Sequence, residues 1–243
     1  MVTFAPILKY NRLPLTNIIK DFLGLGKQAF SANIEIEFAV NIPKDKSKPK
    51  EFYFLQIRPM VVGREAVQVK IDDRRDAWCF SHRTIGNGFY SNIHDIIFVD
   101  PDTFKLQDSE QIASEIGELN SLLFKEGRRC ILIGFGRLGT SDRWLGIPLT
   151  WAQMSQARIV VEADRKELRP EPSLGSHFFH NLTATNMGYF HIQYENEAEA
   201  QLDWEWLLQQ PVWKQTKCVK LVRRDEPFLV KIDGRNFNGI IYK

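Results

Sequence analysis

Two neighbouring segments in which apolar and polar side chains alternate constrain the fold of this chain most strongly. Residues 34–40 read IEIEFAV, so that Ile34, Ile36, Phe38 and Val40 point one way and Glu35 and Glu37 the other. Residues 52–60 read FYFLQIRPM and form the expected return strand. The connection between them, NIPKDKSKPKE, is polar and rich in Lys and Pro, as is typical of a solvated loop. The sequence therefore predicts a β-hairpin.

The remaining patterns predict a mixed α+β protein with flanking helices. Apolar residues from Leu15 to Leu25 recur at helical spacing, and Gly24 and Gly26 end that pattern. A second helix is expected over residues 109–125, with Ile112, Ile116, Leu119, Leu122 and Leu123 on one face. Short strands are expected at AVQVKID, AWCFSH, DIIFVDP, RCILIGFG, ARIVVEA, GYFHIQYE, CVKLVRR and the final FLVKIDGRNFNGIIYK. The irregular order of strands and helices favours mixed sheets over a regular βαβ array. We place a domain boundary after Pro59, giving domains 1–62 and 63–243.

Composition excludes several classes of protein. The chain has 243 residues, of which 44% are hydrophobic and 26% charged, as in an ordinary globular protein. The net charge of +2 disfavours a dedicated nucleic-acid binder, and no apolar run approaches the ~20 residues of a membrane helix. Cys79, Cys130 and Cys218 are far apart and lack metal-ligand spacing, so we expect buried, reduced thiols. With no secretory signal pattern, the expected location is the cytoplasm.

The hairpin carries the first candidate site. Because every second side chain of a strand shares a face, Gln56 and Arg58 lie together, as do Glu35 and Glu37. If the two faces coincide, a carboxylate, an amide and a guanidinium converge. Such a set suits a metal–phosphate group, since carboxylates bind Mg²⁺ and a guanidinium grips phosphate oxygens. The alternative is a solvent-exposed face with ordinary cross-strand pairs.

A glycine-rich loop carries the second candidate. The stretch GFGRLGTSD follows an expected strand, and Gly134, Gly136 and Gly139 would let the backbone approach a ligand. Arg137, Thr140 and Ser141 could hold an anion, but no Walker lysine follows. The alternative is a tight structural turn. Downstream, GSHFFHN places His177 and His180 three residues apart without a third metal ligand. A further hypothesis is a second ligand pocket formed by this loop, including Asp142, together with His177.

The hairpin sequence resembles the end of the ATP-grasp nucleotide-binding domain of phosphoenolpyruvate synthase and pyruvate phosphate dikinase. That family has a strand with a catalytic Glu, a variable loop and a strand with Gln-x-Arg-Pro. Here the matching residues are Glu37 in IEFA and Gln56, Arg58 and Pro59 in QIRP. The resemblance implies that Glu37 and Gln56 face Mg²⁺ and the ATP phosphates. It also implies that Arg58 stabilises charge on the transferring phosphoryl group.

The rest of the chain resembles the carboxyl-terminal region of bacterial PEP/pyruvate-binding domain proteins. The stretches that carry this resemblance are FAPILKY, IGNGFYSNIHDIIFVDP, GFGRLGTSDRWLGIPLTW and PSLGSHFFHNL. In that group the loop is expected to read GPGRWGSSD. This chain differs at Phe135, Leu138 and Thr140 and keeps Gly134, Gly136, Arg137, Gly139, Ser141 and Asp142. The resemblance covers nearly the whole chain, although its ATP-site part covers only about residues 30–60.

The resemblance implies a carboxyl-terminal portion of an ATP-dependent phosphotransferase acting on a small molecule. Three parts of such an enzyme do not fit in this chain: the amino-terminal half of the nucleotide-binding domain, the swivelling domain with its phosphoryl-carrying histidine, and the pyruvate-binding barrel. The missing amino-terminal nucleotide-binding domain of the same parent chain is therefore the expected partner, and the portion alone should be inactive. The rival hypothesis is a non-catalytic α+β module that docks on a partner or binds a ligand.

Overall fold

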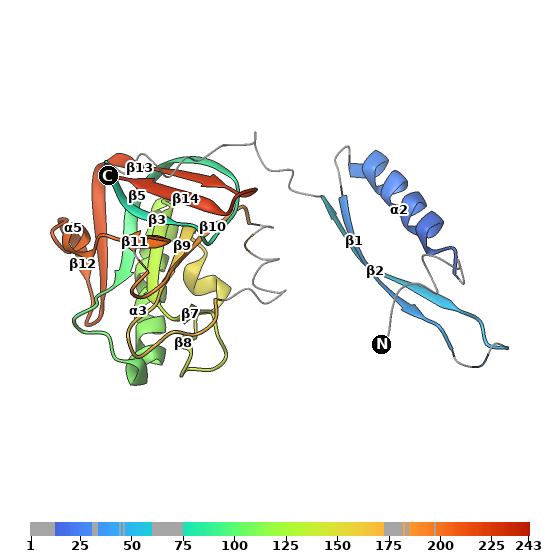
Figure 1. Ribbon diagram of the computed structural model, residues 1–243, viewed down its shortest axis with the longest axis horizontal. Helices are drawn as coiled ribbons and strands as arrows, with labels where there is room; N and C mark the ends of the chain where they lie inside the picture. Colours follow the sequence, from blue (N-terminus) through green and yellow to red (C-terminus); the bar gives the residue numbers. More distant parts are fainter. Residues whose placement is uncertain are drawn as a thin grey trace. The chain divides into compact units, whose positions relative to one another are not determined.

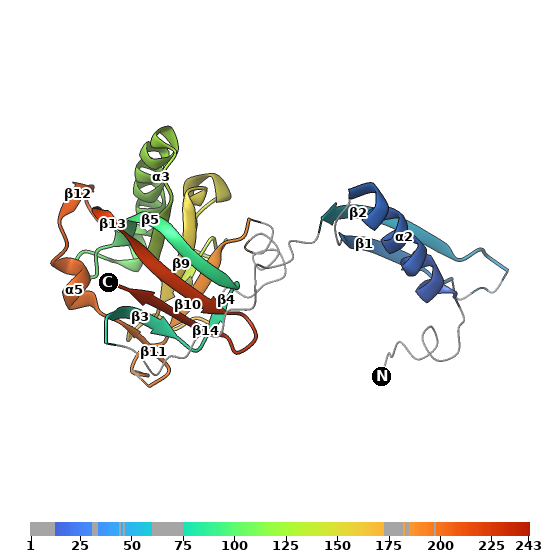
Figure 2. The ribbon, with the colours of Figure 1, turned by 90° about the horizontal axis from the view of Figure 1, so that it is seen from above.

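The computed structural model describes residues 13–30, 34–43, 45, 47–59, 75–172, 182, 185–196 and 198–243 (Figures 1 and 2). The chain divides into two compact units, Met1–Val62 and Gly63–Lys243, here named unit 1 and unit 2. The expected strand AVQVKID lies outside the described residues.

Unit 1 is a helix packed on a hairpin. Helix α2 spans Leu15–Phe30, and strands β1 (Ile34–Asn41) and β2 (Glu51–Pro59) pair antiparallel, which confirms the predicted hairpin. The ring of Phe22 in α2 stacks on Phe52 and Phe54 of β2, with centroids 5.6 Å and 4.8 Å apart. The helix thus covers the apolar face of the two strands (Figure 2).

The prediction that α2 ends at Gly24 and Gly26 is wrong, because the helix continues to Phe30. A Cβ atom at Gly26 would collide with the side chain of Ile34 and lie 2.7 Å from Cδ1 of Ile57. Gly26 therefore lets the helix approach the hairpin closely. Here tertiary packing outweighs the low helix propensity of glycine.

A β-bulge interrupts the hairpin register. Glu37 pairs with Gln56, but the next residue of β1, Phe38, pairs with Phe54, so Leu55 has no partner of its own. The sequence of β2 explains the bulge, since its apolar residues occupy even positions before Leu55 and odd positions after it. One additional residue keeps both sets on the face that α2 covers.

Unit 2 is built on a curled mixed sheet. Its path runs β11-β3-β14-β13-β5-β6-β9-β10-β4, and β12 pairs with β13 beside this path. The strands are β3 (Ala77–Ser81), β4 (Thr84–Ile85), β5 (Gly88–Val99), β6 (Cys130–Phe135), β9 (Ala157–Ala163), β10 (Gly188–Ile192), β11 (Ala200–Leu202), β12 (Val212–Gln215), β13 (Val219–Asp233) and β14 (Asn238–Tyr242). Strands β5, β6, β9 and β10 are parallel neighbours, whereas the other pairs are antiparallel.

The sheet is curled so that its two ends come together. Strand β4 follows β3 after only two residues, yet it pairs with β10 at the other end of the path. The hydroxyl of Ser81 at the end of β3 donates to the carbonyl of His191 in β10 over 2.7 Å. The structure is therefore of the predicted mixed α+β class, with a curled sheet and few helices.

Helix α3 (Ser109–Glu126) connects β5 to β6 and packs beside the parallel strands (Figure 2). It confirms the predicted amphipathic helix, since Ile112, Ile116, Leu119 and Leu123 are fully buried. The helix ends at Gly127, whose φ of 66° is the left-handed conformation that favours glycine after a helix. The other short elements are η1 (Leu106–Asp108), β7 (Arg137–Leu138), β8 (Gly146–Ile147), η2 (Trp151–Met154) and α5 (Trp204–Leu208).

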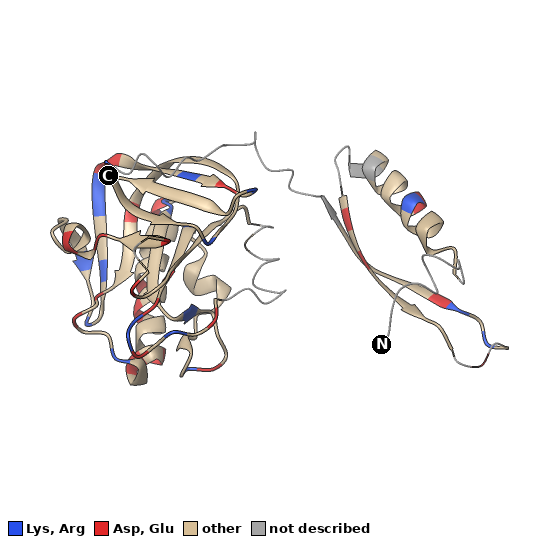
Figure 3. Cartoon of the chain, viewed as in Figure 1, with Lys and Arg blue, Asp and Glu red and all other residues tan. Residues whose placement is uncertain are grey.

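The core of unit 2 contains the three cysteines as free thiols. Burial raises the pKa values of the Cys79 and Cys130 thiols well above their ordinary range, so both stay protonated at neutral pH. Acidic and basic side chains are interspersed over unit 2 (Figure 3). No helix in the described part of the chain is long and apolar enough to cross a membrane.

Candidate functional site

The hairpin register brings the predicted residues of unit 1 opposite one another. Glu37 pairs directly with Gln56, and Glu35 pairs with Arg58. Residues that pair directly across antiparallel strands share a face of the sheet. The condition set by the sequence, that the Glu face and the Gln face coincide, is therefore met for Glu37 and Gln56. The structure describes the backbone of Arg58 and not its side chain.

This polar face lies opposite the face that α2 covers. Glu37 and Gln56 are exposed, whereas Ile34, on the helix side, is buried. Toward the loop end of the hairpin the polar face continues, and there the Asn41 side-chain amide donates to Glu51 over 2.9 Å. This hydrogen bond lowers the pKa of Glu51 because it stabilises the charged carboxylate.

The polar face offers a hard cation one carboxylate and one amide oxygen at a single register position. Mg²⁺ is usually held by one or two protein carboxylates together with substrate phosphates and water. Among the described residues no group of three or more His, Cys, Asp and Glu side chains could hold a metal. A metal bound to this face would therefore take most of its ligands from a nucleotide, from water or from another polypeptide.

The glycine loop of unit 2 is tightly packed against its own chain. Gly136 has φ of 67°, and a Cβ atom there would lie 2.6 Å from the carbonyl oxygen of Leu145. At Gly134, within β6, an added Cβ atom would lie 2.7 Å from the side chain of Leu138. The glycines therefore allow close contact within the protein.

The backbone donors of this loop are used internally. The N–H groups of Gly136, Arg137 and Gly139 donate to backbone carbonyls at 2.9–3.0 Å. The N–H group of Leu138 donates to the buried carboxylate of Glu162 over 2.8 Å. A phosphate cradle needs several backbone N–H groups directed at the ligand, so the geometry favours the structural-turn interpretation for residues 136–139.

Several polar side chains of the loop also have partners in the chain. The Arg137 guanidinium donates to the carbonyl of Glu171. Asp142 accepts a hydrogen bond from the Trp144 N–H over 2.9 Å, and Ser141 is exposed. His177, the remaining member of the hypothetical second pocket, lies outside the described residues.

Two buried polar pairs on neighbouring parallel strands were not predicted from the sequence. The Tyr189 hydroxyl donates to Glu162 over 2.7 Å, and Nε2 of His191 lies 3.2 Å from the Asp164 carboxylate. In both pairs a residue of β10 contacts an acidic side chain. Glu162 belongs to β9, and Asp164 follows directly after that strand. The sequence contains one indication of these pairs: the two acids and their two partners are each separated by one residue, as Glu-x-Asp and Tyr-x-His.

No family model, curated protein or solved structure matches this chain. Of the candidate residues, Glu37 and Gln56 are brought directly opposite one another by the hairpin register.

Proposed function

We propose that unit 1 contributes one wall of a Mg²⁺–ATP site in an ATP-dependent phosphotransferase of the phosphoenolpyruvate synthase and pyruvate phosphate dikinase type. The observation that carries the proposal is the direct pairing of Glu37 with Gln56 on an exposed face. The Glu37 carboxylate and the Gln56 amide oxygen are hard ligands suited to Mg²⁺ on the ATP phosphates.

In this proposal Arg58 acts on the phosphate. It follows Gln56 by two residues on the same strand and pairs with Glu35 in the register. A guanidinium can form two parallel hydrogen bonds with phosphate oxygens and neutralise charge on the transferring phosphoryl group. Catalysis of phosphoryl transfer consists mostly of such positioning and charge neutralisation.

The remaining wall would come from the amino-terminal nucleotide-binding domain of the same parent chain. Unit 1 supports this assignment because, within its described residues, the sheet consists of the pair β1 and β2. Its buried apolar residues, within the described ranges, are Leu13, Leu15 and Ile34. Further strands added at an edge of β1 or β2 would complete the sheet and the site. The acceptor would be a small molecule bound elsewhere in the parent enzyme.

A second candidate function is that of a docking module formed by unit 2. Strand β12 exposes Val212 and Trp213, with 40% and 46% of their surfaces accessible. Tryptophan beside arginine is typical of protein interfaces, and Arg223 lies 3.9 Å from the Trp213 ring centroid.

The proposed ATP site is tested with Mn²⁺ as a paramagnetic substitute for Mg²⁺. We expect Mn²⁺–ATP added to the isotopically labelled full chain to broaden the amide signals around Glu37 and Gln56 first. The Glu37→Gln variant should lose this broadening, whereas Glu51→Gln, which changes an exposed acid of the same hairpin, should keep it. The chain alone should bind Mg²⁺–ATP weakly and turn over no ATP. Tight binding, turnover, or equal broadening in Glu37→Gln would contradict the proposal.

A further inference from the structure

Unit 2 contains a cavity where the curled sheet closes, at the pairing of β4 with β10. Its volume is about 590 Å³, within the range of small-molecule sites. We call it the seam pocket. The described residues that line it include Arg83, Ile85, Pro172, Tyr189, His191 and Phe237.

Two cross-strand pairs lie side by side along the seam pocket. Ile85 of β4 pairs directly with Tyr189 of β10. The same register continues at the end of β4, where the N–H of His191 donates to the carbonyl of Arg83 over 3.0 Å. Because successive side chains of a strand alternate between its faces, these four side chains share one face of the sheet. A polar pair thus follows an apolar pair on the same face.

The imidazole of His191 has a partner at one ring nitrogen and none at the other. His191 is only 3% exposed, and its Nε2 lies 3.2 Å from the Asp164 carboxylate. An ionised carboxylate only accepts hydrogen bonds, so Nε2 is protonated. The other nitrogen, Nδ1, is also buried, and it has no hydrogen-bond partner among the described residues. A buried polar atom without a partner costs free energy, which a ligand bound to Nδ1 would recover.

Arg83 provides a positive charge next to this imidazole. Its side chain is exposed, and in the described part of the chain its guanidinium forms no hydrogen bond or ion pair with another residue. The described residues that line the seam pocket include no carboxylate. A guanidinium binds a carboxylate through two parallel hydrogen bonds. The polar pair of the seam pocket is therefore suited to a carboxyl group.

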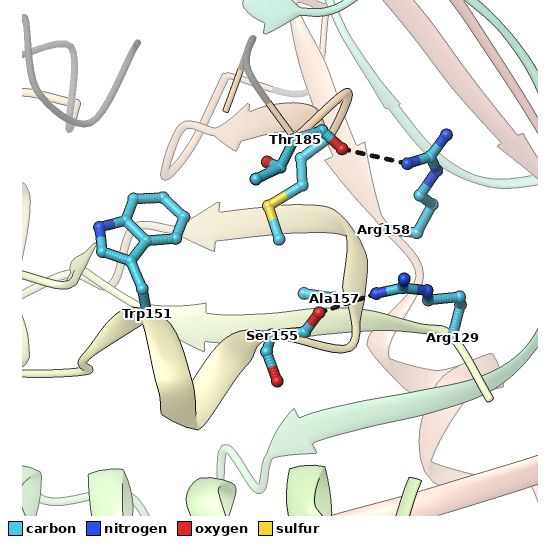
Figure 4. Close-up of a pocket in the computed structure, with 7 residues that line it drawn as sticks. Arg129, Trp151, Ser155, Ala157, Arg158 and Thr185 are labelled. Atoms are coloured by element: carbon cyan, nitrogen blue, oxygen red, sulfur yellow. Dashed lines mark hydrogen bonds between the residues drawn. The ribbon is translucent and has the colours of Figure 1, made fainter. Parts of the chain in front are cut away.

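Another cavity of unit 2, lined by two arginines and Trp151, shows a different arrangement (Figure 4). There Arg129 donates to the carbonyl of Ser155 over 2.8 Å, and Arg158 donates to the carbonyl of Thr185 over 3.1 Å. Both guanidinium groups thus have partners within the protein. The seam pocket differs because it contains a buried ring nitrogen without one, and we therefore place the ligand site there.

The rest of the seam pocket is largely apolar. Ile85 and the ring of Tyr189 line it on the strands, and Pro172 and Phe237 line it from segments outside them. The Tyr189 hydroxyl already donates to Glu162 over 2.7 Å. Apolar walls favour a hydrocarbon body. We propose that the seam pocket binds a monocarboxylic acid with an apolar body, whose carboxyl group contacts Arg83 and His191.

A carboxyl group satisfies Nδ1 of His191 wherever the shared proton resides. A neutral acid donates its O–H to Nδ1, whereas a carboxylate accepts from a protonated imidazole, whose charge Asp164 balances. In both cases the second carboxyl oxygen is available to Arg83. A primary amide of the same shape can donate to Nδ1, but it has no charge to offer the guanidinium. The site should therefore prefer the acid to its amide.

The test is a nuclear magnetic resonance titration of the isotopically labelled full chain in metal-free buffer, so that the proposed Mg²⁺–ATP site cannot contribute. The probes are phenylacetate, phenylacetamide and acetate. We expect phenylacetate to shift the amide signals of β4 and β10 saturably, with a dissociation constant below about 1 mM. Phenylacetamide, which lacks the charge, and acetate, which lacks the apolar body, should each bind at least about tenfold more weakly. No saturable shift with phenylacetate, or equal binding of all three probes, would overturn the proposal.

Two variants separate the polar contacts. Arg83→Gln removes the guanidinium of an exposed residue, so the fold should be retained, and phenylacetate should bind at least about tenfold more weakly. His191→Gln keeps an amide that can donate to Asp164 but removes the second ring nitrogen, and a similar loss is expected. In the wild type, the Nδ1 resonance of His191 should shift together with the amide signals. An Nδ1 resonance that does not move would overturn the proposal even if the variants bind weakly.

Arg235→Gln provides the matched control. Arg235 is an exposed arginine two residues before Phe237, and it is not among the described residues that line the seam pocket. Binding of phenylacetate should be unchanged in this variant. A loss equal to that in Arg83→Gln would indicate a nonspecific charge effect and overturn the proposal. Saturating shifts confined to the hairpin of unit 1 would assign the acid to that unit, with the same consequence.

Discussion

Unit 1 and unit 2 differ in how much of their apolar surface each buries by itself. In unit 2, large side chains such as Trp78, Phe98 and Phe190 are almost completely buried. In unit 1, Leu25 and Leu55 leave 65% and 57% of their surfaces exposed. Buried apolar area is the main source of folding free energy, and the described part of unit 2 buries far more large apolar side chains than the described part of unit 1.

The comparison also separates two ways of placing functional groups. The proposed ATP contacts lie on an exposed strand face of a small unit, where a partner is needed to exclude water. The glycine loop of unit 2 instead uses its backbone N–H groups within the unit, where they donate to carbonyls and to Glu162. We therefore expect the proposed ATP site to depend on a partner.

The largest expected effect is in the core of unit 2. Phe98→Ala removes a fully buried ring and should lower the free energy of unfolding by about 3–5 kcal/mol. All six tryptophans of the chain belong to unit 2, so urea unfolding followed by tryptophan fluorescence reports on this unit alone. Phe124→Ala is the control, because Phe124 in α3 is 67% exposed and its loss should change the free energy by no more than about 0.5 kcal/mol. Similar effects of the two variants would mean that unit 2 lacks the core described here.

A smaller effect concerns pH and is confined to unit 2, since unit 1 has no cysteine. Below pH 9.0, the ordinary thiol value, Cys79 and Cys130 are protonated in both the folded and the unfolded chain. Above it the unfolded thiols ionise, whereas burial keeps the folded ones protonated. The folded state then binds more protons, so the free energy of unfolding should fall as pH rises, by about 1.4 kcal/mol per pH unit for each thiol.

Urea unfolding between pH 8 and pH 10.5 measures this slope. Tyrosines and lysines also titrate in that range, so the informative quantity is the difference between the wild type and Cys79→Ala. In the variant, the free energy of unfolding should fall less steeply with pH, by the amount that one thiol contributes. An identical slope in both proteins would show that the Cys79 thiol is accessible to ionisation in the folded state.

The smallest effect is expected in unit 1. Phe22→Ala removes the ring that stacks on Phe52 and Phe54, but that ring is only half-buried, so the cost should be about 1 kcal/mol. Hydrogen exchange of the full chain should then be about fivefold faster in α2 and the hairpin and unchanged in unit 2. Leu25→Ala, which changes an exposed residue of the same helix, should leave exchange nearly unaltered. Faster exchange in unit 2 after Phe22→Ala would show that the units are energetically coupled.

Elements with strong periodicity were predicted from the sequence. Features that depend on tertiary contacts were not. The hairpin and α3 followed from alternation and helical spacing. The continuation of α2 through Gly26 could not be predicted, because it depends on the approach of Ile34 and Ile57 from the hairpin. The closure of the sheet through β4 and β10 likewise depends on a pairing distant in sequence.

The candidate sites divide in the same way. The shared face of Glu37 and Gln56 required a register that no single strand specifies. The glycine pattern 134–139 left a ligand loop and a tight turn open, because it could not show that its N–H groups bind carbonyls and a carboxylate of the same unit.

The unpaired Leu55 determines which side of the hairpin each later residue of β2 faces. Each residue added to or removed from a strand exchanges inward and outward positions beyond that point. If Leu55 took a regular pairing position while the aromatic residues of β2 stayed under α2, Gln56 and Arg58 would turn toward the helix and Ile57 would face water. The bulge thus decides whether this end of the strand presents a polar or an apolar surface to water, although the same side chains are present in either register.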